Sequence, residues 1–158
     1  MDTVHACPGS QMMAFKNEKQ NGSETAPGNN PSQLGQWPIQ LHLISPTAAY
    51  FQDADVVLTA DCVAYALGEF HGTYLKGRSL AIACPKLDSG QDIYLDKITS
   101  WIDDAKIKSL NVLIMQVPCC AGLLNLAKKA VEKAERKIPL DYTIVGVQGD
   151  ILEQNSIQ

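Results

Sequence analysis

The chain of 158 residues is long enough for one domain with a single core, and its 46% hydrophobic and 19% charged content is that of an ordinary globular protein. The net charge of −4 and the lack of a long basic run argue against nucleic acid as a partner. No apolar stretch approaches the roughly 20 residues that span a bilayer. The N-terminus lacks the basic start and apolar block of a signal peptide. We therefore expect a cytoplasmic protein with no membrane partner.

Composition divides the chain into three parts. Residues 1–16 form a short N-terminal segment that contains Cys7 and is expected to pack on the body. Residues 17–35 are rich in Asn, Gly, Ser, Gln and Pro and contain almost nothing apolar. Such a composition buries too little surface to offset the loss of chain entropy, so we predict a flexible loop. Residues 36–158 form the body, an α/β domain.

Within the body, apolar runs of strand length alternate with stretches of helical periodicity. In chain order, strands are predicted at 39–44, 55–61, 79–84, 109–117 and 142–147. Helices are predicted between them at 47–54, 63–75, 92–106 and 120–137. This alternation indicates an α/β doubly wound domain with a mostly parallel five-stranded sheet, Rossmann-like or flavodoxin-like. The pattern leaves the strand order open.

Two of these helices have well-defined apolar faces. The face of the helix at 92–106 consists of Leu95, Ile98, Ile102 and Ala105. Asp88 or Ser89 is expected to cap its N-terminus. The face of the helix at 120–137 consists of Leu123, Ala127, Ala130 and Ala134. Gly77 is expected to end the helix at 63–75.

Four of the five cysteines follow strands. Cys62 comes directly after the run 55–61, Cys84 ends the run 79–84, and Cys119 with Cys120 follows the run 109–117 and a proline. Because the carboxyl ends of parallel strands meet at one edge, where ligands bind in open α/β sheets, we expect these thiols to lie together. Helix N-termini at the same edge favour thiolates. Cys7, in a Pro-Gly turn, could reach this edge across the flexible segment.

The number and spacing of the thiols suggest what they bind. A [4Fe–4S] cluster takes four thiolates, which Cys7, Cys62, Cys84 and one of Cys119 and Cys120 could supply. Zinc needs the same number, but structural zinc sites usually use C-x₂₋₄-C pairs and the sequence has no C-x-x-C. Iron–sulfur is therefore favoured over zinc, and metal-free thiol chemistry or buried structural cysteine are further alternatives.

Some ligand assignments stay open. Neighbouring side chains in an extended segment point to opposite faces, which favours Cys119 as the ligand and leaves Cys120 as a second ligand or a core residue. At a strand-to-helix turn both could converge on a larger cluster with five thiolates. His5 is a possible metal ligand because it is two residues from Cys7, although a solvated histidine is the alternative. His42 and His71 are expected to have structural roles.

Several stretches together resemble a group of bacterial and archaeal proteins labelled 4Fe–4S ferredoxins or iron–sulfur-binding proteins. They are "HACPGS", the block from Gln33 to His71, "ACPKLD", "VPCCAGL" and "GVQGDIL". Many members of the group also carry a domain with C-x₂-C-x₂-C-x₃-C runs, and no such run occurs in this sequence. The resemblance implies that all five cysteines, Cys7, Cys62, Cys84, Cys119 and Cys120, lie in characteristic motifs of the group.

The expected function is binding of an iron–sulfur cluster for electron transfer or redox sensing, with a redox partner protein and a possible homo-oligomer. A first alternative is an enzyme in which an open iron position of the cluster acts as a Lewis acid. A second is a binding module stabilised by zinc. The sequence lacks G-x-G-x-x-G, G-x-x-x-x-G-K-[ST] and nucleophile-elbow motifs, which disfavours nucleotide binding and serine hydrolase chemistry.

Overall fold

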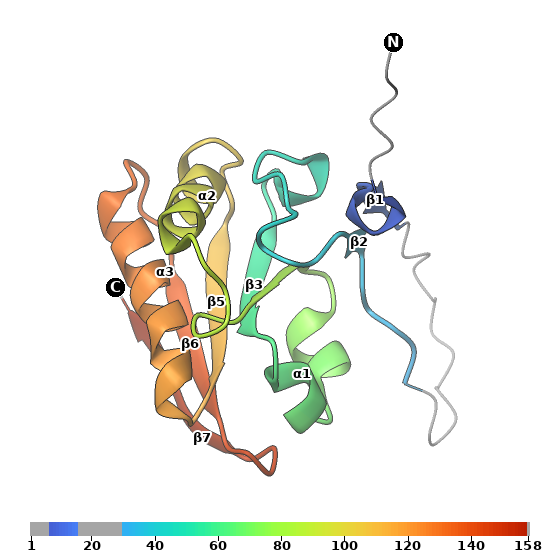
Figure 1. Ribbon diagram of the computed structural model, residues 1–158, viewed down its shortest axis with the longest axis vertical. Coiled ribbons are helices and arrows are strands. Elements are labelled where there is room, and N and C mark those ends of the chain that lie inside the picture. Colours follow the sequence, from blue (N-terminus) through green and yellow to red (C-terminus); the bar gives the residue numbers. More distant parts are fainter. Residues whose placement is uncertain (1–6, 16–29, 158) are drawn as a thin grey trace.

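A computed structural model describes residues 7–15 and 30–157 and has a five-stranded sheet as its centre (Figure 1). The strands are β3 (Asp55–Ala60), β4 (Ser79–Ala83), β5 (Ser109–Met115), β6 (Leu140–Val145) and β7 (Ile151–Ile157). Their order is β4-β3-β5-β6-β7. The first four are parallel, and β7 pairs antiparallel with β6. The predicted fold class, an α/β domain with a mostly parallel five-stranded sheet, is confirmed.

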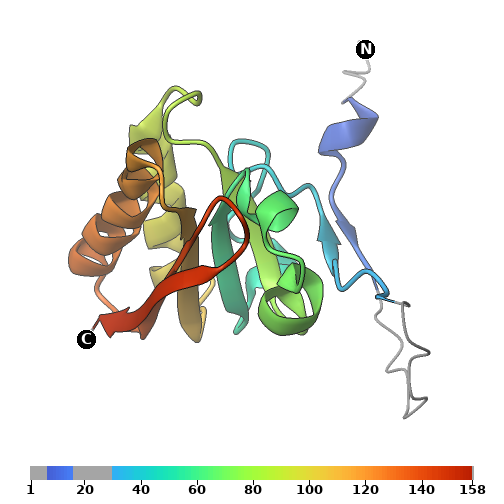
Figure 2. The ribbon, with the colours of Figure 1, turned by 90° about the horizontal axis from the view of Figure 1, so that it is seen from below.

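Helical segments cover both faces of the sheet (Figure 2). The 13-residue helices α2 (Gln91–Asp103) and α3 (Ala121–Lys133) pack side by side on one face. The short helices α1 (Val63–Ala66) and η3 (Phe70–Leu75) lie on the other. There the hydroxyl of Tyr74, on η3, accepts a 3.0 Å hydrogen bond from Gln154 of β7. The sheet is therefore doubly wound over its central strands.

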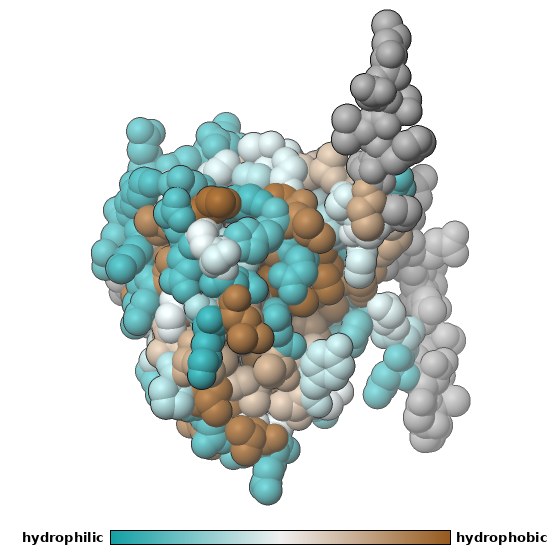
Figure 3. Space-filling view, in the orientation of Figure 1, coloured by the Kyte–Doolittle hydropathy of each residue, from teal (hydrophilic) through white to brown (hydrophobic). Residues whose placement is uncertain are grey.

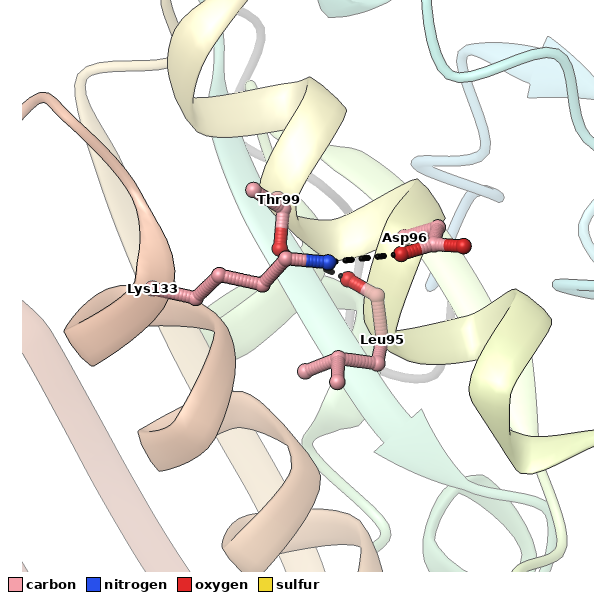
Figure 4. A network of polar contacts seen from close by, with 4 residues as sticks. All are labelled: Leu95, Asp96, Thr99 and Lys133. Carbon is pink, nitrogen blue, oxygen red and sulfur yellow. Dashed lines mark hydrogen bonds and ion pairs between the residues drawn. The ribbon is translucent and has the colours of Figure 1, made fainter.

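The two long helices bury the faces that their periodicity predicts. Ile98, Ile102 and Ala105 are fully buried, as are Leu123 and Ala127. At the surface, Lys133 Nζ of α3 lies 2.8 Å from Asp96 Oδ1 of α2, beside Leu95 and Thr99 (Figure 4). Both side chains of this ion pair are more than half exposed, so it adds about 1 kcal/mol at most. Apolar burial holds the two helices together.

The predicted strand at 39–44 is wrong in extent. Only Gln40 pairs with Ile82 of β4, and residues 41–43 form a turn. Lys97 Nζ of α2 donates 2.8 Å hydrogen bonds to the carbonyl oxygens of residues 41, 42 and 44 and so stabilises this turn outside the sheet. The fifth strand of the sheet is instead β7, whose side chains are almost all exposed and which carries no strand-like apolar pattern.

The predicted helices are shorter in the structure. The helix at 63–75 is interrupted at Leu67, which has an extended backbone, and so it divides into α1 and η3. Only a single 3₁₀ turn, η2 (Ala49–Phe51), forms in 47–54. Helix α3 ends at Lys133 because Ala134 is extended; the following backbone N–H groups of residues 135 and 136 donate to the carboxylate of Asp103.

The N-terminal segment is attached at one side of the sheet. The turn η1 (Pro8–Ser10) and the strand β1 (Met13–Ala14) precede β2 (Gln36–Trp37), which pairs antiparallel with β1. The Gln36 side chain exchanges two hydrogen bonds with the backbone of Leu80 in β4. Most of the predicted flexible loop, residues 17–29, and His5 lie outside the described residues. Within those that are described, no helix is long and apolar enough to cross a membrane.

Candidate functional site at the carboxyl edge of the sheet

We call the space between the carboxyl ends of β3 and β5, where the strand order reverses, the crevice. From β3 the chain continues to β4 on one side, and from β5 it continues to β6 on the other. The connections therefore diverge at the carboxyl ends of these two central strands, which is where open α/β sheets bind ligands. These ends lie at the lower end of the molecule in Figure 1, beside α1.

Cysteines occupy the connections on both sides of this crevice. Cys62 is the second residue after β3, and Cys119 and Cys120 belong to a 3₁₀ turn, η4 (Pro118–Cys120), after β5. Burial raises the pKa of the Cys120 thiol, a hydrogen bond with the Met115 backbone lowers it, and the nearby Cys119 and Cys62 thiols raise it again. Thiols from two neighbouring strands thus lie within electrostatic range of one another.

Cys84 comes to the same edge from the far side of β3. It follows the last residue of β4, and Pro85 comes next. A Cβ atom added to Gly122, in the first turn of α3, would lie only 3.2 Å from the Pro85 Cβ. The connections after β4 and β5 therefore touch each other across the carboxyl end of β3. The structure brings Cys62, Cys84, Cys119 and Cys120 to one edge.

The four edge cysteines differ in accessibility. Cys62 and Cys119 are exposed, Cys84 is half-buried, and Cys120 is buried with 7% of its surface accessible. Cys120 directly precedes α3, whose N-terminus carries no side-chain cap. The backbone N–H groups of Cys120 and Ala121 donate to the carbonyls of Val117 and Pro118, so η4 and α3 form one continuous helical stretch whose positive N-terminal end lies at this edge. Cys120 itself is placed as a core residue of this edge.

Cys7 is not brought to this edge. It precedes η1, and the Trp37 indole N–H donates a 2.8 Å hydrogen bond to the Gly9 carbonyl. The neighbouring Gln36 is bound to Leu80, four residues before Cys84 and about 13 Å back along β4. Both views of the ribbon accordingly show η1 apart from the carboxyl edge (Figures 1 and 2).

A polar network that the sequence did not reveal supports the loop of Cys84. Asp88 Oδ2 accepts hydrogen bonds from the Cys84 backbone N–H at 2.9 Å and from the Tyr94 hydroxyl at 2.5 Å. The ring of His42 stacks on that of Tyr94 at 4.4 Å between centroids, and His42 Nε2 donates to the Ser89 carbonyl at 2.8 Å.

Helix α2 is preceded by Gly90, in the left-handed region with φ of 71°, so the predicted capping of this helix by Asp88 or Ser89 is wrong.

A second carboxylate lies close to this network. Burial, and then the charge of Asp88, raise the pKa of Asp61. Asp61 Oδ1 is buried with no hydrogen-bond partner among the described residues.

His71 lies away from the cysteine loops, and its Nδ1 accepts a 3.0 Å hydrogen bond from the backbone N–H of Gln33. Of the described histidines, only His42 is thus linked to a cysteine loop.

The side chains of the edge do not form a preformed metal-ion site among the residues that the structure describes. In residues 7–15 and 30–157, no three His, Cys, Asp or Glu side chains converge closely enough to hold a metal ion. Tetrahedral zinc with Zn–S bonds near 2.3 Å would require sulfur atoms about 3.8 Å apart. In a cluster each thiolate binds a different iron atom, so the sulfur atoms lie farther apart.

These features define a doubly wound α/β domain with four cysteines in the loops at the carboxyl edge of its sheet. The chain belongs to the Rossmann-like domain family, whose model matches residues 48–158. It is also similar to an uncharacterized protein of Archaeoglobus fulgidus, with 26% identity over 119 residues, which cover 75% of this chain and 83% of the archaeal one. No solved structure gives a significant match. The family match begins at residue 48, so it includes the four edge cysteines but not Cys7.

Proposed function

We propose that this protein binds an iron–sulfur cluster of the [4Fe–4S] type at the carboxyl edge of its sheet and acts in electron transfer or redox sensing. The observation that carries the proposal is the convergence of cysteines from three strand ends on one crevice, Cys62 after β3, Cys84 after β4 and Cys119 after β5. The resemblance of the cysteine motifs to iron–sulfur-binding proteins supports the same assignment.

The residues of the edge have distinct tasks in this proposal. Cys62, Cys84 and Cys119 lose their protons and hold iron as thiolates, aided by the positive end of α3. Cys120 remains a protonated thiol that packs beneath them, because burial raises its pKa. Asp88 fixes the backbone at Cys84. A bound cluster supplies one-electron redox chemistry.

The exposure of Cys62 and Cys119 bears on the role in electron transfer. A redox group held by these side chains lies at the surface, where a partner protein can approach it without rearrangement of the core. The exposed Lys86, two residues past Cys84, is placed to attract an acidic partner surface. A redox partner protein is therefore part of the proposal.

One observation favours a second candidate function. Because Cys7 lies away from the edge and Cys120 is buried, the edge of a single chain offers three accessible thiols, Cys62, Cys84 and Cys119. Three thiolates on a cubane leave one iron without a protein ligand, and such an iron can bind a substrate as a Lewis acid. The protein would then be an enzyme.

Metal analysis of protein purified without oxygen tests the cluster. We expect brown protein with iron and acid-labile sulfide in near-equal amounts. C62S and C119S should lose most of both, whereas S89A, a control in the neighbouring loop, should retain them. Colourless protein that contains zinc would support the zinc module in place of the cluster. Iron retained in both cysteine variants would exclude the crevice as its site.

A further inference from the structure

Cys7 belongs to an N-terminal segment that is separated from the carboxyl edge of the sheet in the same chain. We call residues 7–15, with β1 and its partner β2, the N-terminal ribbon. Three contacts fix it: the pairing of Met13 with Trp37, the Phe15 N–H that donates to the Gly35 carbonyl at 2.8 Å, and the Trp37–Gly9 hydrogen bond. Cys7 is exposed at the outer end of this ribbon.

The surface of the N-terminal ribbon is apolar and uncharged. Met12 is 61% exposed, Met13 43% and Phe15 44%. Residues 7–15 contain no Asp, Glu, Lys or Arg, although 19% of the whole chain is charged. Docking this ribbon would therefore bury apolar area without desolvating a charged side chain. Large apolar side chains exposed together on a small protein mark an interaction surface.

Exposed apolar side chains also lie in the loops that carry the edge cysteines. Tyr65, three residues after Cys62, is 94% exposed, and Leu87, three residues after Cys84, is 82% exposed. Val117, two residues before Cys119, and Val147, at the β6–β7 turn, are exposed as well. Figure 3 shows apolar surface at the lower end of the molecule, where this turn lies. Each connection that carries an edge cysteine thus also presents an apolar side chain.

We propose that the N-terminal ribbon of one copy of this chain docks on the carboxyl edge of a second copy and supplies Cys7 as a thiolate ligand there. This inference rests on the proposed function. Cys7 of the second copy is then the fourth thiolate of the cluster, beside the three from the edge. On binding, the Cys7 thiol exchanges its proton for iron, as the edge thiols do. Reciprocal docking about a two-fold axis produces two equal sites and closes the assembly as a dimer.

Exchange between copies preserves the contacts that hold the N-terminal ribbon. For Cys7 to reach its own edge, the ribbon would have to leave Trp37 and Gly35 and lose its pairing with β2. Docking on a second copy keeps all three contacts and presents Cys7 already in position. A preformed ribbon also loses less conformational entropy on binding than a free segment.

A complementation experiment separates ligation between copies from ligation within one chain. The C7S and C62S variants carry different affinity tags, are co-expressed without oxygen, and are purified through both tags in turn. Such a heterodimer has one competent site, formed by the edge of C7S and the Cys7 of C62S. We expect about half of the wild-type iron and sulfide per chain, whereas each variant alone should contain little of either.

Each other outcome overturns the inference in a distinguishable way. If the heterodimer contains no iron while the wild type contains a full complement, Cys7 binds the cluster of its own chain and not that of the second copy. A full complement in C7S alone would remove Cys7 from the ligands and favour the open iron of the enzyme alternative. No iron in the wild type would overturn the proposed function together with the inference. Circular dichroism verifies that both variants are folded.

The oligomeric state provides a second measurement. By light scattering, the iron-loaded wild type should be a dimer, and a variant with Met12, Met13 and Phe15 all changed to serine should be largely monomeric. That variant retains all five cysteines, so its loss of iron would arise from lost docking. A monomeric wild type with a full cluster would contradict exchange between copies.

Discussion

At the scale of single residues, one aspartate organises the loop that carries Cys84. Asp88 Oδ2 accepts from the Cys84 N–H and the Tyr94 hydroxyl, so a single carboxylate joins the end of β4 to the first turn of α2. Burial, and then this bond, raise the pKa of Tyr94, which keeps the tyrosine a neutral donor. The role could not be read from sequence, because Asp88 before a helix has the pattern of an ordinary cap.

Replacement of Asp88 should weaken the fold measurably. D88A leaves the Cys84 N–H and the Tyr94 hydroxyl without their acceptor, which we expect to cost about 1–3 kcal/mol in the free energy of unfolding. S89A is the matched control, because only the backbone carbonyl of Ser89 is used, by His42. Urea denaturation of both variants provides the measurement. Equal midpoints for D88A and wild type would show that the network adds no stability.

The five thiols should differ in reactivity in the metal-free protein. Only the thiolate form is alkylated, and burial both raises the pKa of Cys120 and shields it. We therefore expect iodoacetamide near pH 8 to modify the exposed Cys7, Cys62 and Cys119 first and Cys120 last. Mass spectrometry of peptides from a labelling time course gives the order. Early modification of Cys120 would contradict its assignment to the core.

At the scale of elements, the β6–β7 hairpin closes against α1 through a glycine. Gly149 has a φ of 89°, and a Cβ atom there would overlap the Ala66 carbonyl oxygen at the end of α1. The hairpin can therefore lie beside the crevice only if residue 149 has no side chain. The sequence motif "GVQGDIL" includes this glycine but does not reveal what it faces.

Two glycines with positive φ should respond differently to alanine. At Gly77, with φ of 74° and open space around it, alanine should cost about 1–2 kcal/mol from the left-handed conformation alone. At Gly149 alanine has the same backbone strain, and its Cβ atom also overlaps the Ala66 carbonyl oxygen. We therefore expect the free energy of unfolding to fall by about 3 kcal/mol or more. Urea denaturation of G77A and G149A measures the difference. Equal losses would indicate that α1 moves aside freely.

At the scale of the whole molecule, the carboxyl edge is assembled from connections that lie far apart in sequence. The Cys62, Cys84 and Cys119 loops follow three different strands, and the contact of Pro85 with Gly122 joins two of them. A group bound by all three loops would link β3, β4 and β5 in the native state and have no equivalent site in the unfolded chain. Its binding free energy therefore adds to stability.

Loss of the cluster should lower the thermal stability of the whole domain. Occupancy at about 100 times the dissociation constant adds about 2.7 kcal/mol, or roughly 5–10 °C in Tm for a chain of this size. We expect calorimetry to show this difference between iron-loaded and metal-free protein. A variant with serine at the four edge positions is the control, and iron and sulfide should not shift its Tm. Equal Tm values for loaded and metal-free wild type would contradict binding across the three loops.

Apolar runs of strand length and helical periodicity were enough to predict the α/β class, the approximate strands β3 to β6 and the location of four cysteines at strand ends, because these patterns report burial directly. Four features became visible only in the folded molecule: the strand order β4-β3-β5-β6-β7, the polar edge strand β7, the turn at 41–43 held by Lys97, and the separation of Cys7 from the other thiols. Each of these depends on contacts between residues distant in the chain, such as Trp37 with Gly9 or Asp88 with Cys84, and local periodicity carries no record of such partners.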